Sequence, residues 1–231
     1  VKAGATTIPD NTKRKWDNLT DVKLILGYGL TEASPETHDS PPNKVKIGSV
    51  GIPIIDTDAK IVDIETGTKE LALGEVGELI VKGPQVMKGY KKRTEETKKT
   101  LRNGWLYTGD LAKMDEEGYF YIVDRLKDTI KYKGYSVFPA EVENVLYTHP
   151  WIKECAVIGK PDSVAGEIPK AYVVLKEGAA ITRDEVIEYC KKRIAPYKRI
   201  REVEFVAELP KNIAGKIMRR ALRNRKYVKK R

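Results

Sequence analysis

The sequence has no apolar run near the ~18 residues that a membrane-spanning helix needs, which excludes a transmembrane helix. It has only two cysteines and two histidines, and no CxxC pair, so no structural zinc site is expected. The unpaired spacing of Cys155 and Cys190 predicts reduced thiols in a cytoplasmic protein. No charged stretch with a following apolar core opens the chain, so no secretory signal is predicted. Because the first residue is Val1 and not Met, we expect a fragment or a processed product.

Acidic residues are missing from the last part of the chain. Residues 211–231 contain ten Lys or Arg and no Asp or Glu, which leaves 33 basic and 33 acidic residues before position 211. The net charge of +10 therefore belongs to a tail on a neutral body. This distribution does not by itself indicate a nucleic-acid partner. The 41% of hydrophobic residues excludes a disordered protein, and 231 residues predict one large or two modest domains.

The predicted secondary structure differs between the first and the last part of the chain. Residues 22–26 predict a buried strand that ends at a Gly-Tyr-Gly loop, with no strand before it and a polar, Pro-rich loop over 34–44. Between 45 and 123, closely spaced glycines separate short strands, which predicts a small barrel or sandwich interrupted by a helix over 94–101. After Arg125, strands alternate with helices. We therefore predict an α+β fold with a boundary near 124–127.

Local signals place the elements of the last part. Pro139 opens a helix that Pro150 stops, and Thr182 with Glu185 forms a capping box before a helix that runs to about Ile194. Further strands are predicted over 152–158, 171–175 and 203–206, and a basic helix over 217–227. The residues DEEG at 115–118 predict a hairpin turn between strands at 111–114 and 119–123.

Four motifs offer chemistry. The first is GYGLTE at 27–32, in which a ring can stack on a base, a hydroxyl can bind a phosphate and a carboxylate can hold Mg²⁺. Glycines there permit close approach of the backbone to a ligand. The second is WLYTGD at 105–110, whose carboxylate suits a ribose diol. Taken alone, the first motif favours a tight turn and the second a turn cap.

The third motif is DRLKDTIK at 124–131, followed by Gly134 and by PAEVE at 139–143. It lies at the predicted domain boundary, where ligand clefts and hinges are common, although such charge clusters are usually solvated surface. The fourth is PKNIAGKIMRR at 210–220. There Lys216 follows a glycine on a loop and could reach a phosphate or a carboxylate. Alternatively, it simply belongs to the basic tail.

In this order and spacing, the four motifs resemble the C-terminal half of an adenylate-forming enzyme. That superfamily includes acyl-CoA synthetases, the adenylation domains of peptide synthetases and firefly luciferase. The resemblance covers the chain from about Asp21 onward. Within the superfamily the sequence most resembles fatty-acyl-CoA ligases, through GPQVMKGY at 83–90, YKGYSVFP at 132–139 and residues 141–149. Asp124 stands where many members have Gly, and Asn212 replaces the more usual Ser or Thr.

The resemblance implies a division into domains. Residues 1–44 would end a large N-terminal adenylation domain, 45–124 would form a barrel-like subdomain, and 125–231 would be a mobile C-terminal domain. It also implies that Tyr28 stacks on adenine, that Thr31 contacts the α-phosphate and that Glu32 binds Mg²⁺. Asp110 and Arg125 would hold the ribose hydroxyls.

For the last part, the resemblance implies a hinge at Lys127, a catalytic Lys216 for adenylation and a pantetheine channel lined by the Gly134 loop. The implied reaction joins a fatty acid to coenzyme A at the expense of ATP, with Mg²⁺ and release of pyrophosphate. The phosphate loop of the family does not occur in this sequence. We therefore expect an incomplete part of the enzyme that folds from Arg125 on but does not adenylate alone.

Other functions remain open from sequence. An aryl-acid or other acid–CoA ligase fits the same motifs, and so does a carrier-protein adenylation domain, although no carrier-type segment follows Lys216. A nucleic-acid-binding module built on the tail is disfavoured, because Tyr227 is its only aromatic residue and offers little for stacking on bases. We expect no nucleic-acid partner. Peripheral contact with a membrane, the oligomeric state and the acyl chain length are left undetermined.

Overall fold

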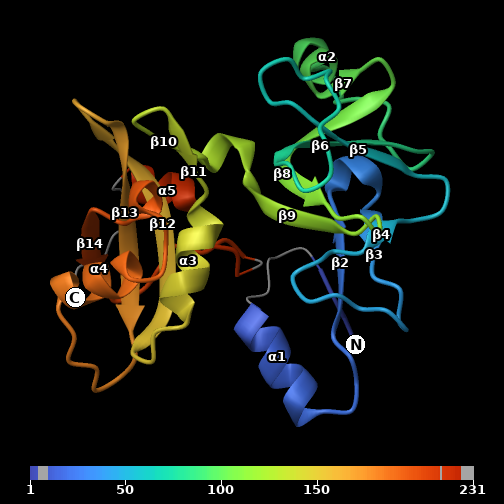
Figure 1. Cartoon of the computed structure of the whole chain (residues 1–231). Coiled ribbons are helices and arrows are strands. Elements are labelled where there is room, and N and C mark those ends of the chain that lie inside the picture. The colour runs from blue at the N-terminus through green and yellow to red at the C-terminus, as the bar shows by residue number, and fades with distance from the viewer. Residues whose placement is uncertain (5–9, 214, 225–231) are drawn as a thin grey trace. The chain divides into compact units, whose positions relative to one another are not determined.

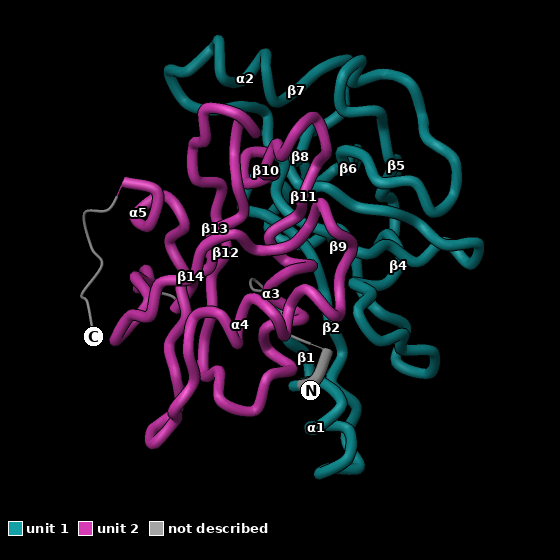
Figure 2. Tube along the Cα trace, turned by 60° about the vertical axis from the view of Figure 1, so that its left-hand side comes forward, with its two compact units in different colours: residues 1–126 teal, residues 127–231 magenta. Residues whose placement is uncertain are grey.

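The chain divides into two compact units, Val1–Leu126 and Lys127–Arg231 (Figures 1 and 2). The computed structural model describes residues 1–4, 10–213 and 215–224. The division falls inside the segment 124–127, where the composition of the sequence changes. In the described part of the chain, no helix is both long and apolar enough to cross a membrane. Each unit has a mixed α+β structure, which confirms the predicted fold class.

Unit 1 begins with a four-stranded sheet in the order β1-β2-β3-β4. Its strands are β1 (Lys2–Ala3), β2 (Ile25–Gly29), β3 (Glu36–Asp39) and β4 (Ile52–Pro53), and helix α1 (Asp10–Leu19) connects the first two. The strand predicted over 22–26 in fact lies three residues later and has β1 as a parallel neighbour. The predicted loop over 34–44 contains β3, with Thr37 and His38 buried. The sequence did not predict this strand because all four of its side chains are polar. Two of them are nevertheless buried, since the strand pairs with β2.

A glycine at the end of β2 sets the close approach of the chain to the functional motif. A Cβ added to Gly29 would lie 1.8 Å from the carbonyl oxygen of Pro35. No side chain can occupy that space, so only glycine lets β2 run directly into the short 3-10 helix η1 (Thr31–Ala33). The Gly-Tyr-Gly segment belongs to strand β2 itself and not to a loop after it. Strand β4, which follows residue 44, pairs with β3, which precedes residue 44.

The second sheet of unit 1 has five strands, in the order β5-β6-β8-β7 with β9 paired to β8. They are β5 (Asp58–Val62), β6 (Gly77–Lys82), β7 (Leu101–Arg102), β8 (Trp105–Met114) and β9 (Phe120–Arg125). Helix α2 (Thr94–Thr100) precedes β7, close to its predicted span. Buried Leu79, Val81, Leu106 and Phe120 form a core that also includes Ala33 of η1. This shared core holds the first motif against the sheet.

Unit 2 is a sheet with helices on both faces. Its strands are β10 (Ile130–Tyr132), β11 (Tyr135–Val137), β12 (Ile152–Asp162), β13 (Gly166–Leu175) and β14 (Glu202–Phe205). Its helices are α3 (Pro139–Tyr147), α4 (Arg183–Lys191), η3 (Pro196–Lys198) and α5 (Arg219–Arg223), and the short helix η2 (Leu126–Asp128) spans the division between the units. Cys155 and Val157 of β12 pack with α3 and α4, while Ala156 and Ile158 pack with Leu222 of α5. This alternation of successive residues is the period of a strand that is buried on both faces.

The helix ends follow the predicted signals in two cases. Pro139 occupies the first turn of α3, and both hydrogen bonds of the Thr182–Glu185 capping box are present at α4. Helix α4 ends three residues before the predicted Ile194. The basic helix predicted over 217–227 begins only at Arg219, because Ile217 instead pairs with Lys211 in an antiparallel bridge. Residues 225–227 of the predicted helix lie outside the described part of the chain.

Candidate functional site

In unit 1, three of the predicted nucleotide-binding residues meet at one carboxylate. Asp110 on β8 lies opposite Arg125 on β9 in the strand register. The Tyr28 hydroxyl donates a 2.7 Å hydrogen bond to Oδ2 of Asp110, and Nε of Arg125 lies 3.3 Å from Oδ1. Both oxygens of Asp110 are thus oriented, yet two contacts use only part of the roughly four acceptor positions of a carboxylate. The remaining positions can accept the two hydroxyls of a diol.

Burial sharpens this arrangement. The side chain of Asp110 is 12% exposed, and its backbone N–H donates to Oγ1 of Thr108 over 3.1 Å. The Thr108 hydroxyl in turn donates to the carbonyl oxygen of Leu79 over 2.7 Å. Burial, aided by the Asp110 carboxylate, raises the pKa of Tyr28 far above its usual value. The phenol therefore stays protonated and remains the hydrogen-bond donor to Asp110.

Thr31 and Glu32 follow Tyr28 on η1, where the chain leaves the sheet. Thr31 is exposed, whereas Glu32 is half-buried and accepts a 2.7 Å hydrogen bond at Oε1 from the Tyr90 hydroxyl. Burial first, and the hydrogen bond to Glu32 second, raise the pKa of Tyr90. The backbone N–H of Met87 donates to the Glu32 carbonyl oxygen over 2.8 Å, so both ends of the residue are held. Sequence reasoning did not assign this role to Tyr90, because nothing local links it to Glu32.

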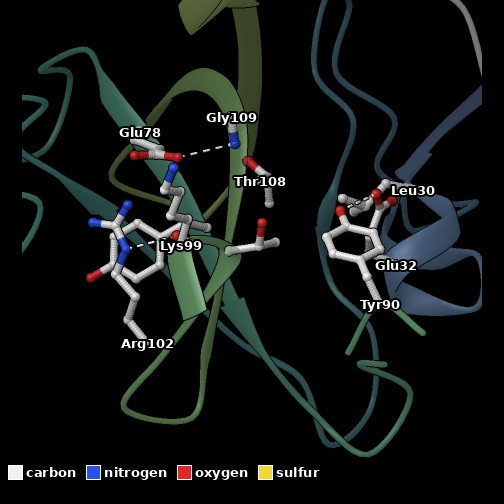
Figure 3. A pocket seen from close by; sticks show the side chains of 10 residues that line it. Leu30, Glu32, Glu78, Tyr90, Lys99, Arg102, Thr108 and Gly109 are labelled. Carbon is white, nitrogen blue, oxygen red and sulfur yellow. Dashed lines mark hydrogen bonds between the residues drawn. The ribbon is translucent and has the colours of Figure 1, made fainter. Parts of the chain in front are cut away.

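A cavity of about 230 Å³ in unit 1 connects these elements (Figure 3). The Glu32–Tyr90 pair lines one part, and Glu78 with Gly109 lines another. Oε1 of Glu78 accepts a 3.0 Å hydrogen bond from the Gly109 N–H. Burial raises the pKa of Glu78 in spite of that bond. The cavity thus places a further carboxylate, that of Glu78, which sequence reasoning missed, beside the segment of β8 that carries Asp110.

The residues present fit a magnesium ion that arrives with a phosphate. No group of three or more His, Cys, Asp or Glu gathers within the described residues, so they form no cage for a metal ion. Glu32 offers one oriented carboxylate next to Thr31. Mg²⁺ commonly takes one or two protein carboxylates and completes its shell with phosphate oxygens and water. Glu32 suits that pattern.

In unit 2, the predicted hinge and channel residues lie near its start. Lys127 is exposed on η2, while its neighbour Asp128 is buried. Lys133 and Gly134 form the two-residue turn between β10 and β11, with φ values of +49° and +84°. Positive φ at both positions is typical of a tight hairpin turn that favours glycine. A Cβ on Gly134 would meet no atom within 4 Å, so the turn is open to its surroundings within this structure.

Lys216 lies in a short hairpin closed by a bridge between Lys211 and Ile217. Asn212 holds this hairpin from both sides: its N–H donates to the Lys216 carbonyl oxygen, and its Oδ1 accepts from the Lys216 N–H, each over 2.9 Å. Asn212 thus supplies a side-chain acceptor that fixes the backbone of Lys216. The side chain of Lys216 is half-buried.

The chain matches two descriptions of one enzyme family. Residues 1–91 match the AMP-binding enzyme family, and residues 141–216 match the AMP-binding enzyme C-terminal domain. A long-chain-fatty-acid–CoA ligase of Bacillus subtilis is 52% identical over 222 residues, which are 95% of this chain and 39% of that protein. The chain therefore spans well under half the length of this relative.

Two solved structures resemble both the fold and the sequence. ATP-bound MatB from Rhodopseudomonas palustris matches 97% of this chain and 44% of its own chain, with a TM-score of 0.93 and 36% identity. The o-succinylbenzoate CoA synthetase of Bacillus subtilis, in complex with ATP and magnesium ion, matches 96% of this chain and 45% of its own, with a TM-score of 0.84 and 35% identity. With the Tyr28–Asp110–Arg125 arrangement and the ordered motifs, these matches show that the chain belongs to the adenylate-forming family of AMP-binding enzymes.

Proposed function

We propose that this chain supplies part of an ATP-dependent fatty-acid–CoA ligase. The observation that carries this proposal is the orientation of the Asp110 carboxylate. Tyr28, on the Gly-Tyr-Gly strand, and Arg125, on β9, both contact it. The similarity to a long-chain-fatty-acid–CoA ligase supports the fatty acid as substrate. The enzyme would first adenylate the acid with release of pyrophosphate, and then transfer the acyl group to coenzyme A.

In unit 1 we assign the nucleotide contacts. The ring of Tyr28 stacks on adenine, and Asp110 with Arg125 holds the ribose hydroxyls. Thr31 contacts the α-phosphate with its exposed hydroxyl. Glu32, held at one oxygen by Tyr90, keeps its other oxygen for Mg²⁺. The ion would neutralise charge on the phosphates.

The first half-reaction joins two anions. An oxygen of the fatty-acid carboxylate attacks the α-phosphorus, the bond to the bridging oxygen breaks, and pyrophosphate leaves with the electron pair. Positive charge near the reacting oxygens stabilises this transition state most, because negative charge from both reactants is concentrated on those oxygens. We assign that charge to the ammonium group of Lys216, which would make it the catalytic lysine of this step.

In the second half-reaction the coenzyme A thiolate attacks the acyl carbonyl, and the bond from that carbon to the AMP oxygen breaks. Lys216 has no part in this step. We propose that the Gly134 turn lines the path of the thiol and that Lys127 is the hinge about which the C-terminal unit moves between the steps. Such domain rotations let one site present two sets of residues, provided the hinge absorbs the change in φ and ψ.

A second substrate class has a specific observation in its favour. The o-succinylbenzoate CoA synthetase, whose name gives an acid with an aromatic ring, resembles this chain at 35% identity. An aryl-acid–CoA ligase is therefore the alternative, and the residues described above would serve it equally. The shape and lining of the acyl pocket decide between the two substrate classes.

ATP–pyrophosphate exchange with a panel of acids tests the proposal. The enzyme containing this chain should exchange pyrophosphate in the presence of long-chain fatty acids and Mg²⁺, while the 231-residue chain alone should not. Preference for aryl acids would favour the alternative substrate class. Exchange with no acid of the panel would contradict the proposed function, and robust exchange by the chain alone would contradict its predicted dependence on further residues.

We also propose a cytoplasmic location. The two cysteines, Cys155 and Cys190, are free and buried in the core of unit 2. Burial raises the pKa of both thiols, which keeps them protonated and unreactive. A reducing compartment is the setting in which such a core needs no disulfide.

A further inference from the structure

One arginine ties the hairpin that carries Lys216 to the rest of unit 2. Arg219 begins α5, shortly after Lys216, and its guanidinium reaches Glu143 on α3. Nη2 lies 2.7 Å from Oε2 of Glu143, and Nε donates to Oε1 over 3.3 Å. Two contacts to one carboxylate fix the orientation as well as the distance, which a lysine cannot reproduce.

The acceptor of this fork is itself fixed to the sheet. The side chain of Glu143 is 12% exposed, and that of Arg219 is 21% exposed. Oε1 of Glu143 also accepts a 2.7 Å hydrogen bond from the N–H of Val157 on β12. The carboxylate is therefore held independently of the arginine. It is an anchor point on the core of the unit.

A second carboxylate extends the cluster to the start of unit 2. Asp128, next to Lys127, has a side chain that is only 9% exposed. Its Oδ2 lies 3.7 Å from Nη1 of Arg219, and its Oδ1 lies 3.0 Å from Nη1 of Arg223. Two arginines and two carboxylates thus join α3, α5 and the residue that follows the predicted hinge.

The hairpin of residues 211–217 is fixed at its base. The Met218 N–H donates to the Pro210 carbonyl oxygen over 2.8 Å, and Nζ of Lys211 lies 2.7 Å from Oε1 of Glu154. Ile213, in contrast, is fully exposed. Helix α5 has only five residues, and a helix this short does not hold its own direction in water. The course of the chain beyond Lys216 therefore depends on contacts with the rest of unit 2, which are the packing of Leu222 on the sheet and the ion pairs of Arg219 and Arg223.

We propose that Arg219 and Glu143 are positioning residues that place Lys216 for the adenylation step, with Asp128 holding the other side of the arginine. The inference rests on the proposed function, because it concerns the step assigned to Lys216. A lysine is a point charge on a flexible stem, so its effect on a transition state depends on where its backbone is held. A misplacement of ~1 Å can cost about 100-fold in rate.

Amide hydrogen exchange of residues 211–218 in the 231-residue chain tests the anchorage directly. Arg219→Met should speed exchange there about tenfold, the effect of losing one charged hydrogen-bonded contact, and Arg219→Lys should give a smaller increase. Glu143→Gln keeps an acceptor for Val157 and should loosen the hairpin without unfolding the unit. Arg193→Met is the matched control, since this exposed arginine lies on the Tyr189 ring at the end of α4. Unchanged exchange in Arg219→Met would overturn the proposal.

The two half-reactions show whether the anchorage matters for catalysis. In the enzyme containing this chain, Arg219→Met and Glu143→Gln should lower ATP–pyrophosphate exchange about 100-fold. Thioester formation from supplied acyl-adenylate should keep its rate. An equal fall in both steps would mean a merely structural role and would overturn the proposal. If the unmodified enzyme shows no ATP–pyrophosphate exchange, the proposed function fails instead. Amide hydrogen exchange in the 231-residue chain then still tests whether Arg219 anchors the hairpin.

Discussion

The hydroxyl of Tyr28 and the carboxylate of Asp110 lie 2.7 Å apart although 82 residues separate them in the chain. Tyr28 is the next-to-last residue of β2, and Asp110 follows Thr108 and Gly109 within β8. This contact joins the two sheets of unit 1 at the point where the proposed nucleotide contacts gather. Removing it should affect both the stability of unit 1 and the binding of ATP.

We expect Tyr28→Phe to lower the free energy of unfolding by about 1.5–3 kcal/mol, because it removes a buried hydrogen bond to a charged group. The ring is retained, so stacking on adenine should persist while the hold on the ribose weakens. Denaturant unfolding measures the first effect. Tyr107→Phe is the control, since its hydroxyl donates to the neutral carbonyl oxygen of Gly67 and should cost only about 0.5–1.5 kcal/mol. Equal losses in the two variants would contradict the role given to Asp110.

A bulky residue at Gly134 should block the thioester step. Gly134→Leu forces a side chain into a φ of +84°, at a cost of about 1–2 kcal/mol, but meets no atom in the folded unit. The unit should fold, adenylation should persist and acyl transfer to coenzyme A should fail. Gly178→Leu introduces the same strain at φ +73° in another open turn of unit 2 and should spare both steps. Loss of adenylation in Gly134→Leu alone would refute the channel assignment.

Lys216→Ala should abolish adenylate formation and largely spare thioester formation from supplied acyl-adenylate, because only the first step needs the positive charge. Rates of the two half-reactions, measured separately in the enzyme containing this chain, check this. Lys191→Ala removes an exposed lysine that pairs with Glu188 on α4 and should leave both rates unchanged. Equal loss of the two steps in Lys216→Ala would speak against the assigned role.

His38 should make unit 1 sensitive to acid. Its ring packs against Phe120 at 4.6 Å between centroids, and burial lowers the pKa of His38 to about 3 from an ordinary 6.5. Between these values the unfolded chain binds a proton that the folded chain does not. Stability is therefore complete above pH 6.5 and falls by up to about 1.4 kcal/mol per pH unit on acidification toward pH 3.

Denaturant unfolding at several pH values measures this slope. His38→Gln has no imidazole to protonate and should flatten the dependence. His149→Gln is the comparison: burial also lowers the pKa of His149, but this residue belongs to unit 2. If His38→Gln and the unmodified chain lose stability in parallel between pH 6.5 and 4, the buried neutral form of His38 is not the cause.

Local chemistry made some elements predictable from sequence. Pro139 and the Thr182–Glu185 capping box define helix starts within a few residues, so α3 and α4 begin where expected. Strand β3 was missed because its buried residues, Thr37 and His38, are polar, and their burial depends on pairing with β2. The basic helix near the end was placed too early, since the hairpin around Lys216 is closed by contacts with Pro210 and Asn212 that hydrophobic spacing does not reveal.

The site was predictable where ordered motifs supplied it. Tyr28, Asp110 and Arg125 were assigned through the resemblance, and the structure brings their side chains together. The partners that orient Glu32 and Arg219 could not be found in this way. Tyr90 is 58 residues from Glu32, and Glu143 is 76 residues from Arg219, so only the fold determines these pairs. The sequence did contain the two acidic residues, Asp128 and Glu143, and the later run of arginines, but it did not indicate which of them pair.

The stoichiometry of the complete reaction shows whether the thioester forms through an acyl-adenylate. The enzyme containing this chain is incubated with a long-chain fatty acid, ATP, Mg²⁺ and coenzyme A, and all products are quantified. We expect one AMP and one pyrophosphate for each acyl-CoA formed, because the acyl-adenylate is the proposed intermediate. Formation of ADP and phosphate with the thioester, or of no thioester from any acid tested, would contradict it.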